Sequence, residues 1–314
     1  MNLSCSAIVL QTALLLLLAP LVSGFIRSWK ARLQIRRGPP PWQLYLDLAK
    51  FLRKDMVISE HASWVFSAAP YVVFISALVA GLMIPMLTAQ APLSLFGGVL
   101  AVVGLLALGR FFLALGGLDP GSAFGGMGSS REMTIAAIAE PAMMLAVFTV
   151  AIGAGSTDLS RMVQASIGPA WKLFNPAHVM AFVALFIVLL AETGRIPVDN
   201  PATHLELTMI HEAMLLEYSG RYLALMEWGA SIKQLVLMTL LANVFFPAGI
   251  AAAATPAALA VSIAAFAAKL AALAAAVVLV ETTNAKMRLF RVPDLLSAAF
   301  VLAALSLLST FLFT

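Results

Sequence analysis

Residues 8–22 read IVLQTALLLLLAPLV and contain no charged side chain. A helix needs about 20 apolar residues to cross the hydrocarbon core of a bilayer, and this stretch with its flanks is long enough. Similar apolar runs recur along the chain. The eight runs cover residues 4–26, 68–88, 93–115, 134–155, 177–193, 232–250, 257–281 and 292–313. They predict an all-α, polytopic membrane protein with about eight transmembrane helices, in a single membrane domain over residues 1–314.

The composition excludes a soluble domain. Of the 314 residues, 62% are hydrophobic and only 11% are charged, whereas a soluble globular chain carries about 25% charged residues. A soluble domain of this size needs a polar surface that so few charges do not supply. Lipid is therefore expected to surround most of the chain.

The first run resembles a signal peptide only superficially. A signal peptide carries its positive charges before the apolar region, whereas here Arg27, Lys30 and Arg32 follow it. We therefore expect a retained span, and cleavage near Ser23–Gly24 is the alternative.

Lys and Arg alternate between the loops in the way that sets membrane orientation. The connections between the basic segments carry only Arg161 and Lys172. The basic segments are 27–54, 110–132, 191–233 and 281–293. We expect these segments in the cytoplasm and both termini outside, in the cytoplasmic (inner) membrane of a bacterium or archaeon. The net charge of +4 then reflects topology rather than nucleic-acid binding.

Segment 27–55 is a basic cytoplasmic loop with an expected amphipathic helix. Gly38 and three prolines break the chain. The apolar positions that then recur at helical spacing are Leu44, Leu48, Phe51 and Leu52. This pattern predicts a helix that lies in the membrane interface. The loop can anchor on anionic lipid or dock a cytoplasmic partner, and the two roles are compatible.

Segment 191–231 is acidic and lies on the cytoplasmic side. Asn200 and Pro201 are typical of a helix start, and Gly220 is typical of a helix end. On that helix Glu206 and Glu217 fall on nearly the same face. The residues of another face are His204, Thr208 and His211. The helix is either a solvated one or one that is partly buried, and the apolar residues between its charges favour partial burial.

Ionisable residues stand in or at the edges of the apolar runs, and they are Glu140, Glu192, Lys269 and Glu281. A charged group at mid-bilayer costs about 2.5–3.5 kcal/mol on insertion scales, so such groups pair or face a hydrated interior. Structural salt bridges are one interpretation. A proton relay is favoured because the carboxylates outnumber the cations in these runs, and like charges close together hold protons.

The chain has one cysteine, Cys5, and four histidines. An iron–sulfur cluster takes about four cysteines, and only His204 and His211 are close in sequence. We therefore expect no metal and no redox cofactor in this chain, so that any redox chemistry belongs to partner subunits.

Several motifs together resemble complex I subunit 1, a family that includes the corresponding membrane subunit of bacterial respiratory NADH dehydrogenase and the matching membrane subunits of group 4 nickel–iron hydrogenases. The motifs are Arg36-Arg-Gly-Pro39, Ser129-Ser-Arg-Glu132, Glu140, Ala191-Glu-Thr-Gly-Arg-Ile-Pro-Val-Asp199 and Glu217-Tyr-Ser-Gly220. The resemblance covers essentially the whole chain.

Three details favour the hydrogenase branch of that family. Complex I typically has Phe-Asp-Leu-Pro-Glu where this chain has Val198-Asp-Asn-Pro-Ala202, and its first loop differs from Arg36-Arg-Gly-Pro-Pro-Pro41. The stretch from Thr203 to Glu212 is similar to the subunits of hydrogenase-4, formate hydrogenlyase and energy-converting hydrogenase. The altered loop argues against a complex-I-type quinone site.

The resemblance implies a non-catalytic membrane-anchor and coupling subunit of an oxidoreductase complex, which links a cytoplasmic redox module to H⁺ or Na⁺ translocation. Its implied coupling residues are Glu140, Glu192, Asp199, Glu206, Glu212, Glu217 and Lys269. Its implied docking residues are Arg36, Arg37, Arg131 and Arg195. The implied partners are hydrogenase-like large and small subunits, a ferredoxin-like iron–sulfur subunit and antiporter-like membrane subunits, with the nickel–iron centre and clusters in those partners. The alternatives are a quinone-binding subunit 1 of NADH:quinone oxidoreductase and a stand-alone transporter.

Overall fold

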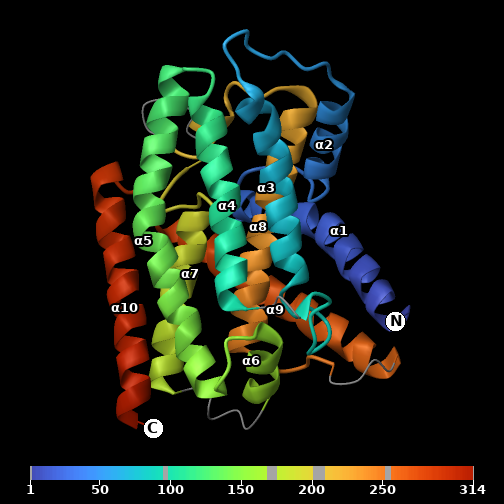
Figure 1. Ribbon diagram of the computed structural model, residues 1–314, viewed down its shortest axis with the longest axis vertical. Coiled ribbons are helices and arrows are strands. Elements are labelled where there is room, and N and C mark those ends of the chain that lie inside the picture. The colour runs from blue at the N-terminus through green and yellow to red at the C-terminus, as the bar shows by residue number, and fades with distance from the viewer. Residues whose placement is uncertain (1, 95–97, 168–174, 201–208, 252–255, 314) are drawn as a thin grey trace.

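The computed structural model describes residues 2–94, 98–167, 175–200, 209–251 and 256–313. Within these ranges the regular structure is helical, and the only β-type pairings are isolated bridges. The α-helices are α1 (Asn2–Leu33), α2 (Gln43–Arg53), α3 (Trp64–Leu82), α4 (Val99–Leu118), α5 (Ala123–Ala154), α6 (Leu159–Ser166), α7 (Pro176–Glu192), α8 (Gly220–Phe245), α9 (Pro256–Thr283) and α10 (Val292–Phe313), and the 3-10 turns η4 (Glu212–Leu215) and η5 (Leu289–Arg291) precede α8 and α10 (Figure 1).

Seven of the described helices are long and apolar enough to cross a membrane: α1, α3, α4, α5, α8, α9 and α10. This confirms the all-α, polytopic prediction. Helix α7 is apolar but has only 17 residues, which gives a length of about 26 Å at 1.5 Å per residue. It coincides with the predicted fifth run.

Two helices begin well before the apolar runs that predicted them. Helix α5 starts at Ala123 and helix α8 at Gly220, because the polar residues ahead of each run continue the same helix. The Ser122 side chain caps α5 by accepting a hydrogen bond from the backbone N–H of Gly125. Hydropathy marks only the apolar part of a helix, so it misses such polar first turns.

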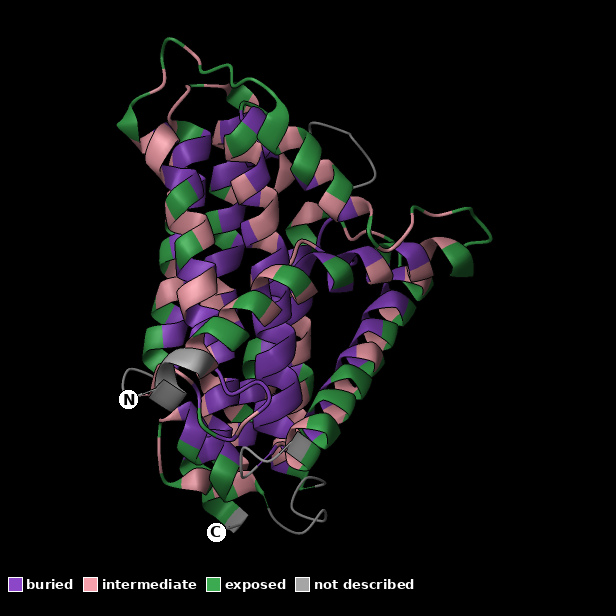
Figure 2. Ribbon diagram, turned by 90° about the vertical axis from the view of Figure 1, so that its right-hand side faces the viewer, coloured by how far each residue is buried: buried purple, intermediate pink, exposed green. Residues whose placement is uncertain are grey.

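Helix α8 is the core helix of the bundle. It is the least apolar of the seven long helices, yet 83% of its most apolar window is buried, against 22% in α10. Figure 1 shows α8 behind α3 and α4, and Figure 2 shows buried residues concentrated through the middle of the bundle. Its inward-facing polar side chains include Ser231, Gln234, Thr239 and Asn243. The polar interior of the protein is therefore organised around α8.

Helix α2 lies where the amphipathic pattern predicts a helix. Leu44 and Leu48 are buried against Ala224 of α8. Leu52, expected on the same apolar face, is 43% exposed, and the α2 residues that pack in this cluster are Leu44, Leu48 and, in part, Phe51. The position of α2 in a membrane interface stays a prediction.

The segment before α8 differs from the helix predicted to end at Gly220. Residues 201–208 lie outside the described residues, and from Met209 onward the chain forms the turn η4 instead of an α-helix. Gly220 opens α8 with a φ of +51°, and a Cβ there would lie 2.9 Å from backbone oxygens of Lys54 and Asp55. Glycine is needed at this position because the backbone has a left-handed conformation and is closely packed.

Candidate functional site

Arg110 is the centre of a charge cluster buried between α4, α5 and α7. Its side chain is 2% exposed. Its Nη1 lies 2.5 Å from Oε1 of Glu140, its Nε lies 3.7 Å from Glu132, and its Nη2 donates to Glu192. The guanidinium has five N–H donors in a planar fork, so one arginine can contact three carboxylates at once.

Lys233 of α8 completes this cluster. Its Nζ lies 2.8 Å from Oε2 of Glu192, whose side chain is 2% exposed. The Arg110 cluster thus consists of Arg110, Glu132, Glu140, Glu192 and Lys233. Three carboxylates face two cations, so the formal charge of the cluster is −1 when every group is ionised. One proton makes it neutral.

Close packing of α4 on α5 brings Arg110 and Glu132 together. The hydroxyl of Ser129 on α5 donates to the carbonyl of Ala114 on α4 at 2.9 Å. The two helices run in opposite directions. Arg110 lies one turn before Ala114 on α4, and Glu132 lies one turn after Ser129 on α5, so the two side chains lie at the same level. The spacing of these residues on their helices therefore determines the contact.

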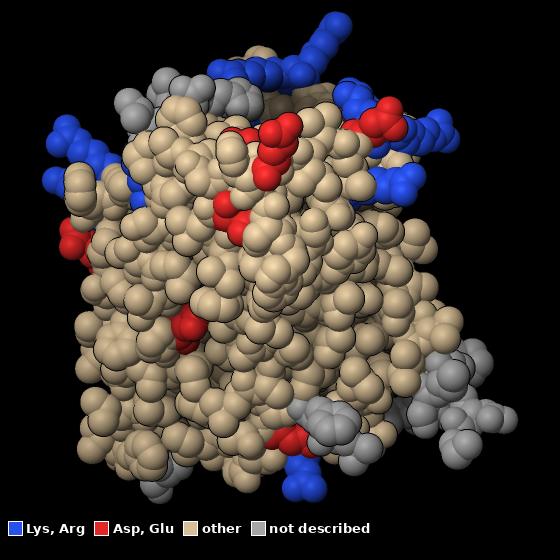
Figure 3. All heavy atoms as spheres, turned by 45° about the horizontal axis from the view of Figure 1, so that its top comes forward, with Lys and Arg blue, Asp and Glu red and all other residues tan. Residues whose placement is uncertain are grey.

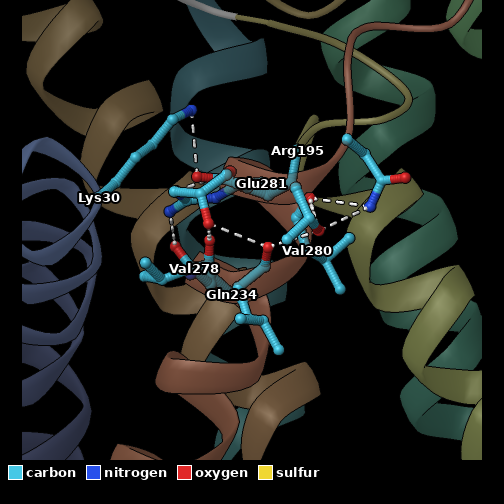
Figure 4. A network of polar contacts seen from close by, with 10 residues as sticks. Lys30, Arg195, Gln234, Val278, Val280 and Glu281 are labelled. Carbon is cyan, nitrogen blue, oxygen red and sulfur yellow. Dashed lines mark hydrogen bonds and ion pairs between the residues drawn. The ribbon is translucent and has the colours of Figure 1, made fainter. Parts of the chain in front are cut away.

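A second cluster joins α1, α8, α9 and the turn after α7. Arg195 donates to Gln234 at 2.9 Å and lies 3.4 Å from Glu281, while Lys30 lies 3.2 Å from the other carboxylate oxygen of Glu281 (Figure 4). The hydroxyl of Ser23 also donates to Gln234, at 2.8 Å. Burial lowers the pKa of the Arg195 guanidinium, an effect that Glu281 opposes. The ordinary pKa of arginine is so high that the group stays charged.

Asp199 connects three segments of the chain. One carboxylate oxygen lies 2.7 Å from Nζ of Lys286, in the loop after α9. The other accepts hydrogen bonds from the backbone N–H groups of Ile210 at 3.1 Å and His211 at 3.4 Å. The carboxylate therefore fixes the start of the segment that leads into η4.

A cavity of about 590 Å³ reaches both clusters. It lies among α1, α2, α8 and the turn after α7, and the basic loop between α1 and α2 forms part of its wall. Its charged lining residues are the cations Arg27, Lys30, Arg36, Arg37, Arg195 and Lys233 and the carboxylates Asp47, Glu192, Asp199, Glu212, Glu227 and Glu281. Figure 3 shows most of the visible Lys and Arg around the upper rim of the molecule, while most of the remaining face has no charged side chain.

The structure brings together some of the predicted coupling residues. Glu140 and Glu192 belong to the Arg110 cluster, and Asp199 and Glu212 line the cavity. Glu206 lies outside the described residues, together with His204 and Thr208.

Two predicted coupling residues lie elsewhere. Glu217 is exposed, as is Leu216, directly after the buried η4 residues Ala213, Met214 and Leu215. Lys269 donates to Asn243 at 3.1 Å. Asn243 is ten residues beyond Lys233 on α8, which is about 15 Å along the helix. Neither Glu217 nor Lys269 lines the large cavity or contacts the Arg110 cluster among the described residues.

The predicted docking arginines divide into two pairs. Arg36 and Arg37 are exposed at the mouth of the cavity. Arg131 donates to the carbonyl of Met209 at 2.9 Å, and Arg195 is buried against Glu281. Arg195 therefore holds the interior of this chain together and does not present a docking surface.

The most connected residue of the site, Arg110, was not predicted from the sequence. The charge pattern assigns Arg110 to the basic segment 110–132, although it also lies inside the predicted span 93–115 with apolar residues on both sides. That context was the available signal, because a lone arginine in an apolar run needs an internal counter-charge. Glu132 and Lys233 carried no comparable signal, since each lies beside polar residues. Within the described residues, no group of three or more His, Cys, Asp or Glu could hold a metal ion.

Comparisons with known proteins give a consistent result. The sequence model of the family described as NADH dehydrogenase matches residues 5–313. Hydrogenase-4 component C of Escherichia coli is 35% identical over 94% of this chain and 92% of its own length. Formate hydrogenlyase subunit 4 of Escherichia coli is 34% identical over 96% of both chains. An NADH-quinone oxidoreductase subunit of Mesorhizobium japonicum is 31% identical over 77% of this chain and 74% of its own.

A solved structure shows the same fold. A chain from the membrane-bound sulfane sulfur reductase, an archaeal respiratory membrane complex, superposes with a TM-score of 0.83. The match covers 96% of this chain and 99% of that one, at 20% sequence identity.

Proposed function

This chain belongs to the NADH dehydrogenase family, the family of complex I subunit 1, and we propose that it is the membrane-anchor and coupling subunit of a complex resembling hydrogenase-4 or formate hydrogenlyase. Members of the family are subunits of oxidoreductase complexes. In this role the chain carries no redox centre. Hydrogenase-like large and small subunits and a ferredoxin-like iron–sulfur subunit move the electrons, and antiporter-like membrane subunits move H⁺ or Na⁺.

The observation that carries the proposal is a continuous series of charged contacts from the cavity to the outer side of the bundle. Lys233 and Glu192 line the cavity, Glu192 contacts Arg110, and Arg110 contacts Glu140. The side chain of Glu140 is 31% exposed, against 2% for Glu192. The series thus begins at the cavity and ends where a neighbouring membrane subunit can reach it.

The Arg110 cluster can transmit a change in charge because its groups are close and poorly solvated. Coulomb interactions over 2.5–3.7 Å are much stronger in a protein interior than in water. A displacement or protonation at Lys233 or Glu192 changes the field at Glu140. The cluster has three carboxylates and two cations, so the forces among its groups depend on that field. The cluster therefore either passes a proton or passes an electrostatic influence.

The redox module docks at the basic loop between α1 and α2. Arg36 and Arg37 are exposed and stand at the cavity mouth, so a partner that binds them also covers the cavity. In this arrangement the cavity opens toward the cytoplasm, both termini lie outside, and the chain sits in the inner membrane. Redox-driven movement of the docked module then alters the hydration and charge of the cavity.

The cavity suits water better than an apolar quinone. Its volume of about 590 Å³ is within the range of ligand sites, but such sites carry only a small number of polar groups. Six cations and six carboxylates line this one. Their formal charges balance, so no charged ligand is required, and these charged side chains can hold ordered water.

Reversal of the two exposed arginines tests the anchoring role. In the Arg36→Glu/Arg37→Glu variant we expect the hydrogenase-like soluble subunits to be lost from washed membranes, by about tenfold or more, because two attractive contacts become repulsive. The chain itself should insert at the normal level. Arg161→Glu is the matched control, since this arginine is 76% exposed and outside the cavity. Full retention of the soluble subunits by the double variant would contradict docking at this loop.

A further inference from the structure

The loop between α9 and α10 forms a basic pocket that is separate from the coupling site. The pocket has a volume of about 370 Å³, which is within the range of ligand sites. Its lining residues are Ala285, Lys286, Met287, Arg288 and Arg291. Three of these five are cations and none is a carboxylate, whereas cations and carboxylates are equal in number in the large cavity. The pocket therefore favours an anion.

Two contacts fix the shape of this loop from its inner side. The backbone N–H of Met287 donates to the carbonyl of Pro197 at 2.9 Å. The Nζ of Lys286 lies 2.7 Å from the carboxylate of Asp199. Both partners belong to the turn after α7, so the inner wall of the pocket is held by the protein itself and does not depend on a ligand for its shape.

The two arginines of the pocket have no anionic partner among the described residues. Arg288 and Arg291 are exposed, and neither forms an ion pair with a described carboxylate. The nearest carboxylates along the chain, Glu281 and Asp294, do not line the pocket. A guanidinium presents a planar set of donors that matches a phosphate group. Two guanidinium groups in one pocket without a carboxylate therefore suit a phosphate.

The pocket lies where lipid headgroups are expected. Its loop joins two stretches that are long and apolar enough to cross a membrane, Ala257–Thr283 and Leu289–Leu312, so the loop lies at one face of the bilayer. Phe290 and Arg291 both fall within the second stretch, and Phe290 is 91% exposed. Near the end of a span an arginine extends to the headgroups while an apolar neighbour stays among the acyl chains.

We propose that this pocket binds the phosphate of an anionic phospholipid from the surrounding bilayer. Arg288 and Arg291 contact the headgroup, and Phe290 packs against an acyl chain of the same lipid. Basic pockets between transmembrane helices bind such headgroups in other membrane proteins. Because Lys286 lines the pocket and also contacts Asp199, the bound lipid lies next to the segment that leads into η4. The proposal does not depend on the coupling function, since it requires only that the chain spans a membrane.

Photo-crosslinking tests which molecule covers Phe290. In the assembled complex Phe290 is replaced with p-benzoylphenylalanine, and the complex is reconstituted in vesicles of equal parts phosphatidylethanolamine and phosphatidylglycerol. Ultraviolet light joins the side chain to the molecule that contacts it, and mass spectrometry identifies that molecule. We expect phospholipid adducts in which phosphatidylglycerol exceeds phosphatidylethanolamine by about fivefold or more. Adducts with a protein subunit in place of lipid, or equal amounts of the two lipids, would overturn the proposal.

A charge variant tests the two arginines directly. In the same photo-crosslinking background, we expect Arg288→Gln/Arg291→Gln to bring the two lipids close to equal amounts among the adducts, because two cations are lost while the apolar contact is kept. Arg161→Gln is the matched control, since Arg161 is exposed and lies outside the pocket, and it should keep the excess of phosphatidylglycerol. An unchanged excess in the double variant, or an equal loss in the control, would overturn the proposal.

Discussion

Two lysine ammonium groups at different levels of α8 have different kinds of partner. Lys233 contacts the carboxylate of Glu192 at 2.8 Å, beside Arg110 and the large cavity. Ten residues further along, Asn243 accepts a hydrogen bond from Lys269 of α9 at 3.1 Å. The amide nitrogen of Asn243 donates to the carbonyls of Pro85 and Met86 at 2.8 and 2.9 Å. One lysine has an anionic partner, and the other has a neutral one.

This difference shows where the chain concentrates its titratable anions. At the Lys233 position three carboxylates, a cavity and the basic loop come together. At the Lys269 position the described polar contacts are an amide and backbone carbonyls, which do not titrate near neutral pH. We therefore propose that protonation-based coupling belongs to the first region and that Lys269 has a structural role.

Removal of the central guanidinium should have the largest effect on stability. Arg110→Leu leaves three carboxylates with only Lys233 beside them, and a buried charge that loses its partner costs about 3–5 kcal/mol. We expect the variant to accumulate poorly in membranes. The detergent-solubilised complex should lose its monodisperse form at a clearly lower temperature than the wild type.

A combined variant sharpens this prediction. Adding Glu140→Gln and Glu192→Gln to Arg110→Leu removes two of the uncompensated charges, so it should recover part of the lost thermal stability. If the triple variant is no more stable than Arg110→Leu, the loss arises from packing rather than from charge.

The two lysines should differ in the cost of their removal. Lys233→Met breaks an ion pair with a buried carboxylate, and hydrogen bonds to charged groups contribute about 1.5–3 kcal/mol. Lys269→Met removes an ammonium whose partner is the neutral amide of Asn243. Because a charged group in an apolar helix is itself costly, we expect the stability of the protein to fall by less than about 1 kcal/mol or to rise. Thermal denaturation of the two purified variants measures both. A larger loss for Lys269→Met would contradict the comparison.

The sequence was sufficient to predict the helical membrane fold because apolar length is a local property. Runs such as 68–88 and 292–313 correspond to α3 and α10. The helix at Gln43–Arg53 was likewise visible from local periodicity. The polar starts of α5 and α8 were not, since a helix that leaves lipid keeps its backbone hydrogen bonds but loses its hydropathy signal.

The site could be predicted only in part, because its contacts are long-range. Glu140 and Glu192 stood out as charges in apolar runs, but nothing local shows that both contact Arg110, which is 30 residues from the first and 82 from the second. The pairing of Arg195 with Glu281 spans 86 residues. Charge in an apolar run predicts that a partner exists, whereas the packing of helices decides which residue it is.

The central claim is that the Arg110 cluster couples redox turnover to ion movement through its outermost carboxylate. Glu140→Gln keeps the size and hydrogen-bonding capacity of the side chain and removes its titration. The substitution should permit normal assembly. Lys269→Met is the control variant, because it removes a charge from the region for which we propose no coupling role.

The measurement is ΔpH formation or Na⁺ uptake in vesicles that contain the assembled complex, recorded together with redox turnover. We predict that ion movement per turnover falls by about tenfold or more in Glu140→Gln and stays near the wild-type value in Lys269→Met. Wild-type ion movement per turnover in Glu140→Gln would contradict the claim and leave Glu140 as a structural partner of Arg110.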